Sequence, residues 1–149
     1  MKPLLLFYNR PSLFLFFFVL SCTLKQKDNI QCDNLSTINP NGSSEMALFM
    51  RDLSKKCDTN KVRLKNNQPI SFNISADKIL TAKMTKGHHM DSTYKAFALQ
   101  FIDQIKAINN EKSIERQAFF YNAMIQNCTS CHQNRCPGPI TKIKKLYVK

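Results

Sequence analysis

Apolar residues recur every three or four positions in four parts of the chain, the spacing that places them on one face of an α-helix. The first stripe begins at residue 45 and the third near residue 92, a shorter one covers residues 75–84, and the last begins after residue 113. No alternation of apolar and polar residues indicates strands. Because the connections between these segments are short to moderate, the pattern predicts an all-α fold, an antiparallel four-helix bundle.

Polar and helix-breaking residues mark the ends of these stripes. Residues that can accept a hydrogen bond from a first-turn N–H precede three of them: Ser43, Ser44, Asp91, Ser92 and Ser113. The sequences NNQP after residue 65 and PGP after residue 136 are expected to end the first and the last helix. The second helix is the least defined, because residues 70–74 (ISFNI) also fit an extended segment.

The first 21 residues are typical of a signal peptide of the lipoprotein type. Lys2 and Arg10 precede residues 13–20 (LFLFFFVL), an uncharged apolar run. A transmembrane helix needs about 20 apolar residues, so a run this short predicts the apolar region of a signal peptide instead. The residues VLSC, which end at Cys22, resemble a bacterial lipobox, in which the cysteine is lipidated after cleavage. Ordinary cleavage and an uncleaved anchor are the alternatives.

The rest of the chain divides into a tether and a folded body. Residues 22–42 are polar, contain Pro40 and Gly42, and show no hydrophobic period, so we expect a flexible tether there. Residues 43–149 form the predicted helical body. We therefore expect an exported, periplasmic protein that is anchored to the membrane by a lipid on Cys22.

The chain is strongly basic, with a formal net charge of +12 at pH 7. Residues 1–21 contain two basic and no acidic side chains, so the remainder carries 12 − 2 = +10. Nucleic acid is not the expected partner, because an exported protein rarely meets it and the lysines are spread along the chain. Solvated helix faces account for most of this charge, and acidic proteins or anionic lipid headgroups would be attracted by the rest.

Residues 128–132 (CTSCH) follow the pattern C-x-x-C-H, the attachment sequence of c-type haem. On a helix, two cysteines three residues apart lie on one side and can reach both vinyl groups of one porphyrin. The histidine that follows can then bind the iron as an axial ligand. The pattern predicts one covalent haem c on Cys128 and Cys131, with His132 as the proximal ligand.

Three other kinds of site could use the same residues. A zinc site would take Cys136 as a fourth ligand, but the order of the motif and the oxidising export route favour haem. A thioredoxin-like dithiol expects a strand before its helix, and none is predicted here. A structural disulfide within the stretch is the third alternative. The sequence shows no paired acid and base, so we do not expect an enzyme.

The position of the motif resembles that in the cytochrome c-prime family of four-helix-bundle haem proteins, which carry C-x-x-C-H on the last helix. The segments that carry the resemblance are EMALFMRDL, ILTAKMT and CTSCHQNRCPGPITKIKKL, within residues 43–146. The short second helix and Cys136 depart from the better-known members. The resemblance implies a monohaem cytochrome that passes single electrons to redox partner proteins of a respiratory chain, and it leaves open whether the chain forms a homodimer.

The resemblance also implies a second axial ligand on the first helix. Low-spin members place a methionine there and carry electrons, whereas high-spin members keep the position open and bind gases such as nitric oxide. Met50 aligns with the family's methionine and is the expected ligand; Met46, four residues earlier on the same helical face, and an open site are the alternatives. His88 and His89 are expected to be solvated in a loop. Two arginines are candidates for pairing with the haem propionates: Arg51 and Arg135.

Three further cysteines remain: Cys32, Cys57 and Cys136. If the first and last helices are antiparallel and Met50 lies opposite His132, the chain after His132 heads towards the start of the first helix and its tether. Cys57 lies seven residues past Met50 in the other direction, about 10 Å along the helix. We therefore expect a Cys32–Cys136 disulfide rather than Cys57–Cys136.

Overall fold

The structure is a computed structural model that describes residues 44–149. These residues contain five α-helices. Three are long: α2 (Glu45–Lys65), α4 (Ser92–Asn110) and α5 (Ile114–Arg135). Two are short: α3 (Lys78–Thr81) and α6 (Ile140–Lys144). These residues include no strand, so the predicted all-α fold class is confirmed. None of the described helices has the length and apolar content needed to cross a bilayer.

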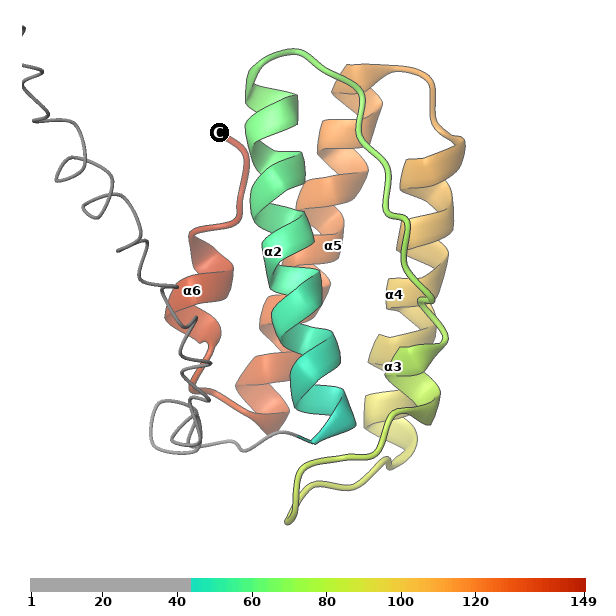
Figure 1. Cartoon of the computed structure of the whole chain (residues 1–149), viewed down its shortest axis with the longest axis vertical. Coiled ribbons are helices and arrows are strands. Elements are labelled where there is room, and N and C mark those ends of the chain that lie inside the picture. Colours follow the sequence, from blue (N-terminus) through green and yellow to red (C-terminus); the bar gives the residue numbers. More distant parts are fainter. Residues whose placement is uncertain (1–43) are drawn as a thin grey trace, which may run out of the picture. The chain divides into compact units, whose positions relative to one another are not determined.

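The three long helices pack lengthwise, and α5 runs in the opposite direction to α2 and α4 (Figure 1). Only three residues join α4 to α5, and so short a connection makes the two helices antiparallel neighbours. As a result, the first halves of α2 and α4 meet the second half of α5 at one end of this bundle. The predicted signal peptide and tether lie outside the described residues.

Each long helix begins at a polar residue that caps it. Ser44, Asp91 and Ser113 accept hydrogen bonds from backbone N–H groups three residues further on, over 3.1, 2.8 and 3.4 Å. These bonds satisfy N–H groups that have no partner within the helix. The predicted starts of the three long helices are confirmed.

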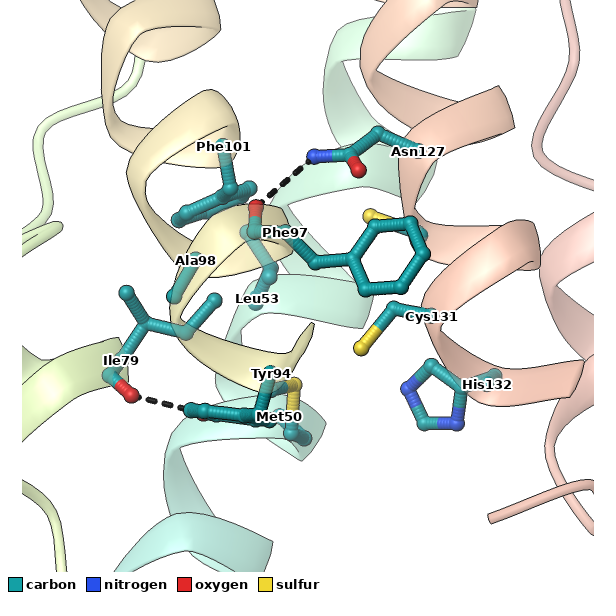
Figure 2. Close-up of a pocket in the computed structure, with 11 residues that line it drawn as sticks. Met50, Leu53, Ile79, Tyr94, Phe97, Ala98, Phe101, Asn127, Cys131 and His132 are labelled. Carbon is teal, nitrogen blue, oxygen red and sulfur yellow. Dashed lines mark hydrogen bonds between the residues drawn. The ribbon is translucent and has the colours of Figure 1, made fainter. Parts of the chain in front are cut away.

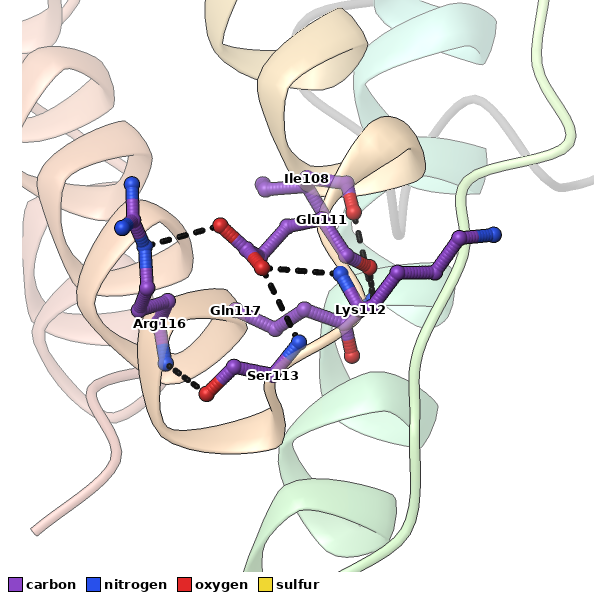
Figure 3. A network of polar contacts seen from close by, with 6 residues as sticks. All are labelled: Ile108, Glu111, Lys112, Ser113, Arg116 and Gln117. Atoms are coloured by element: carbon purple, nitrogen blue, oxygen red, sulfur yellow. Dashed lines mark hydrogen bonds and ion pairs between the residues drawn. The ribbon is translucent and has the colours of Figure 1, made fainter.

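The turn between α4 and α5 is closed by the carboxylate of Glu111 (Figure 3). Its Oε1 accepts from the backbone N–H groups of Lys112, at 2.8 Å, and Ser113, at 2.9 Å, and its Oε2 lies 2.8 Å from Nε of Arg116. The bond from Ser113 is the main reason why the pKa of Glu111 lies below its usual value. One side chain thus ties the turn to the first residues of α5.

The core is built from the apolar stripes of the long helices, which face inward as predicted. Burial of such side chains is the main stabilising term, at roughly 25 cal/mol per Å² of apolar surface. The largest fully buried side chains are Tyr121, Phe101, Ile108, Met124, Ile125 and Cys57.

The segment between α2 and α3 is extended, and side-chain amides from three helices hold its backbone. Gln117 on α5 bonds to both the N–H and the C=O of Ile70, each over 2.9 Å. Asn109 on α4 bonds to both the N–H (2.7 Å) and the C=O (3.1 Å) of Phe72. Asn60 on α2 donates to the carbonyl of the residue between them, at 3.0 Å. These amides supply the partners that a helix or a sheet would otherwise provide.

The second predicted helix is confirmed only for its central turn. The sequence predicts a helix over residues 75–84, but the structure is helical only over Lys78–Thr81. The alternative for residues 70–74, an extended segment, is correct. The described chain therefore has three long helices rather than the four of the predicted bundle. One physical reason is that the start of α2 binds the backbone of Lys83: its N–H donates to Oε2 of Glu45 at 3.1 Å, and its carbonyl accepts from the N–H of Met46 at 3.0 Å.

A helix that was not predicted, α6, follows α5. Residues 137–139 end α5 as expected, and the chain then turns back so that α6 packs against α5 (Figure 1). Ile143 and Leu146 are buried in the core. The hydroxyl of Tyr121 on α5 lies 3.1 Å from the carbonyl of Leu146 and 3.0 Å from that of Cys57 on α2, so it links all three segments.

Candidate functional site

A pocket lies where the first halves of α2 and α4 meet the second half of α5 (Figure 2). Most of its lining is apolar or aromatic: Leu53, Ile79, Tyr94, Phe97, Ala98 and Phe101. The other lining side chains carry sulfur, an imidazole or an amide: Met50, Asn127, Cys128, Cys131 and His132. The four side chains that the sequence predicts to bind haem therefore line one pocket.

The pocket is small and partly open, with a free volume of about 30 Å³. That is roughly the volume that one molecule occupies in liquid water. A flat macrocycle would therefore have to displace some of the lining side chains. The ring of Phe97 lies in the pocket beside Cys131 (Figure 2). Phe97 and Met50 are half-buried, whereas the other apolar lining residues are buried. These two side chains are therefore the parts of the wall that can move at the lowest cost.

Cys128 and Cys131 lie one turn apart near the end of α5 and are both partly buried. Burial raises the pKa of Cys128 to about 12 and is also the main cause that raises the pKa of Cys131. Both thiols are therefore protonated at neutral pH. A protonated thiol is a poor metal ligand and a poor partner in disulfide exchange, because both processes use the thiolate.

The imidazole of His132 is oriented by the backbone at the end of α5. Its Nδ1 lies 3.0 Å from the carbonyl oxygen of Cys136. A carbonyl only accepts hydrogen bonds, so the geometry assigns the proton to Nδ1 and leaves a lone pair on Nε2. Burial lowers the pKa of His132 and so favours the neutral ring. Neutral imidazole is the form in which histidine binds a metal.

The structure separates the two candidate methionines. Met50 lines the pocket on the side across from His132 (Figure 2). Met46, one turn earlier, is buried but does not line the pocket. Its Sδ lies 3.8 Å from the hydroxyl of Tyr94, which also donates to the carbonyl of Ile79 at 2.6 Å. The geometry favours Met50 over Met46 as the thioether that faces His132.

Two polar residues of the pocket were not predicted as site residues. Tyr94 belongs to the apolar stripe of α4, and burial raises the pKa of its hydroxyl to about 12. Asn127 is buried, and its Nδ2 donates to the carbonyl of Phe97 and to Oε1 of Gln104, each at 3.1 Å. Its Oδ1 has no hydrogen-bond partner. Its position four residues before Cys131, on the same face of the helix, was the signal that could have revealed it.

The charged side chains and loop histidines that were considered for the site do not line the pocket. Arg135 forms an ion pair with Asp91, the cap of α4, and this hydrogen bond is the main cause that lowers the pKa of Asp91 to about 2. Nε of Arg51 donates to a carbonyl of its own helix at 3.2 Å. His88 and His89 are exposed, as expected.

None of the four cysteines among the described residues forms a disulfide: Cys57, Cys128, Cys131 and Cys136. Cys57 is buried in the core, which raises its pKa. The Cys57–Cys136 pairing is therefore not formed. The thiol of Cys136 is free, so the predicted Cys32–Cys136 disulfide is not formed either. Cys22 lies outside the described residues, and with it the predicted lipid anchor.

The pocket thus combines two thiols, a neutral imidazole and a thioether within apolar walls. Among residues 44–149, no three His, Cys, Asp or Glu side chains converge so that they could hold a metal ion by themselves. A haem iron needs no such cluster, because the porphyrin supplies its equatorial ligands and the protein only the axial ones. No protein-family model, curated protein or solved structure matches the chain.

Proposed function

We propose that the chain is an exported monohaem cytochrome c that carries single electrons by means of one covalently bound haem. The main support is that C-x-x-C-H brings two thiols and a neutral imidazole into one apolar pocket, with a thioether across from them. Cys128 and Cys131 would hold the haem, and His132 and Met50 would bind its iron. The fold is then a cytochrome c-prime-like bundle in which the extended segment and α3 replace the second helix.

The protonation states of the four side chains suit this role. Cys128 and Cys131 share one side of α5, so both can reach the same porphyrin. A thioether carries no charge, so attachment to a vinyl group keeps each sulfur in the neutral form that burial already favours. His132 presents the lone pair of Nε2, because its Nδ1–H is donated to a backbone carbonyl. None of these four side chains has to become charged to hold the cofactor.

Whether the thioether of Met50 binds the iron decides between electron transfer and the binding of gases. The haem would supply an iron that takes up and releases one electron, and a thioether ligand raises its reduction potential and blocks small ligands. Electron transfer is favoured because Met50 lines the pocket, while Met46 packs beside the hydroxyl of Tyr94. Without ligation by Met50, the apolar walls would border an open site for a gas such as nitric oxide, which is the second candidate function.

The remaining expectations complete the proposal. Residues 1–21 direct export to the periplasm, Cys22 carries the lipid anchor, and residues 22–42 allow the haem domain to reach its redox partners. The net positive charge favours partner proteins with acidic surfaces. Neither nucleic acid nor catalysis has a role in this proposal.

The first experiment is intact-mass spectrometry of protein made together with a haem-ligation pathway. The wild type should carry the mass of one haem, and the double variant Cys128→Ser/Cys131→Ser should carry none. Cys136→Ser is the matched control, because it removes a nearby cysteine but not an attachment point, and it should keep the haem. A wild-type mass equal to the polypeptide plus any lipid would refute the proposal.

An absorption spectrum of the reduced protein then separates the two functions. A sharp low-spin spectrum that carbon monoxide leaves unchanged supports axial ligation by a methionine and electron transfer. A broad high-spin spectrum that shifts with carbon monoxide supports the gas-binding alternative.

A further inference from the structure

At the end of α5, two hydrogen bonds of opposite direction join His132 and Cys136. The backbone N–H of Cys136 donates to the carbonyl of His132 at 3.0 Å, which is the last bond of the helix. In return, Nδ1 of His132 lies 3.0 Å from the carbonyl of Cys136. The plane of the imidazole therefore depends on where the carbonyl of Cys136 points.

The sequence after α5 fixes the direction of that carbonyl. Cys136 precedes Pro137, which keeps it out of the helical conformation, and its φ and ψ are −153° and 80°. The carbonyl of Pro137 accepts from the N–H of Ile140 at 3.1 Å, where α6 begins. Ile143 then buries α6 against the core. The turn is held by α5 on one side and by a docked helix on the other.

We propose that this turn, residues 136–139, is a positioning element for His132 that sets the reduction potential of the haem iron. This inference rests on the proposed function and names the part of the chain that regulates the site. A hydrogen bond from Nδ1 to an acceptor makes Nε2 a stronger donor. A stronger donor stabilises ferric iron more than ferrous iron, so the turn holds the potential down. Loosening the turn weakens the bond and raises the potential.

The test compares two single substitutions within the turn. Pro137→Gly releases the backbone of Cys136, because glycine imposes no restriction on the residue before it. Gly138→Ala is the matched control, because a Cβ at that position meets no atom within 4 Å. Spectroelectrochemical titration of the full chain with haem attached should show a higher reduction potential for Pro137→Gly and the wild-type value for Gly138→Ala. A tenfold change in the preference for ferric iron corresponds to 59 mV for one electron.

A second measurement on the wild type keeps the test informative should Pro137→Gly fail to fold. In the reduced protein, the Nδ1–H of His132 should exchange with water much more slowly than ring protons of the exposed His88 and His89. Rapid exchange at His132, or an unchanged potential in folded Pro137→Gly that carries haem, would overturn the inference and leave the proposed function standing. A wild type without haem would refute the proposed function and this inference with it, and mass spectrometry distinguishes that case.

Discussion

Two methionines one turn apart on α2 have different surroundings. Met50 lines the pocket across from His132, whereas Met46 packs in the core beside the hydroxyl of Tyr94. The helical periodicity puts both on one face, and only the family resemblance preferred Met50. The sequence could not distinguish them physically, because the contact between Met46 and Tyr94 joins residues 48 positions apart.

Substitution of Met50 tests its role directly. Met50→Ala should convert the sharp low-spin spectrum of the reduced protein into a broad high-spin spectrum that responds to carbon monoxide, because it removes the proposed thioether ligand. Met46→Ala is the control and should keep the low-spin spectrum. It should still lower the free energy of unfolding, by about 2–5 kcal/mol, because it empties a buried position. The reverse pattern in the two spectra would make Met46 the ligand.

Asp91 gives the molecule a defined response to acid. Its pKa is lowered from 3.8 to about 2, first of all by the hydrogen bond from Arg135. The ionised carboxylate therefore stabilises the folded chain above about pH 4, and this contribution is lost as the pH falls to about 2. Asp91→Asn keeps a good helix cap but loses the charge. It should melt at a lower temperature than wild type at pH 7, and its melting temperature should fall less between pH 4 and pH 2.

Thermal unfolding followed by circular dichroism from pH 2 to pH 7 measures this difference. Asp91→Ala loses both the charge and the cap, so it should be the least stable of the three at pH 7. Parallel curves for the wild type and Asp91→Asn below pH 4 would contradict the assignment.

At the scale of elements, local sequence signals predicted the long helices but not the short ones. The three long helices each combine a capping residue with a sustained apolar stripe, and both signals are local. The helix predicted over residues 75–84 had only a short stripe, and its neighbouring segment is held by amides from distant helices. The five residues of α6 are too few to show a period. The sequence therefore did not predict the short elements, whose structure depends on tertiary contacts.

Gln117 is the amide on which the extended segment depends most. Its Nε2 lies within 3.2 Å of the carbonyls of Ile70, Ile108 and Glu111, and its Oε1 accepts the N–H of Ile70. Gln117→Ala leaves buried groups without partners, at about 1–3 kcal/mol each. We expect a loss of unfolding free energy on the order of 3 kcal/mol, together with faster hydrogen exchange at the amide of Ile70.

Chemical denaturation and hydrogen exchange provide the readouts. Gln133→Ala, at an exposed position of the same helix, is the control and should change the stability by less than about 0.5 kcal/mol. If exchange at Ile70 were the same in both variants, the amide of Gln117 would not be what holds the segment.

At the scale of the whole molecule, the described residues share one core with a pocket at one end. The sequence predicted the all-α class, the buried faces of the long helices and the residues that meet in the pocket. It could not predict how little free volume the pocket has, or that the chain returns along α5 as α6. Both features depend on how separate helices pack, as the link from Tyr121 to Cys57 and Leu146 illustrates.

Leu146 tests whether the C-terminal segment is part of that shared core. Leu146→Ala should reduce the free energy of unfolding by about 2–5 kcal/mol, because the side chain is buried. The loss should appear as an earlier single transition in denaturant. Lys144→Ala, an exposed neighbour, should have almost no effect. A separate early transition for the C-terminal segment would show that α6 unfolds on its own.

The amides that hold the extended segment reach only its main-chain atoms. The side chains of Ser71 and Asn73 in this segment are exposed, so neither the amide side chains nor packing in the core restricts which residues can stand there. In a saturation library, these two positions should accept most residues. The intolerant positions would be found on the surrounding helices instead, at Asn60, Asn109 and Gln117. Sequence variation should therefore be high at the exposed positions of the extended segment and low at the three amide residues that bind its backbone.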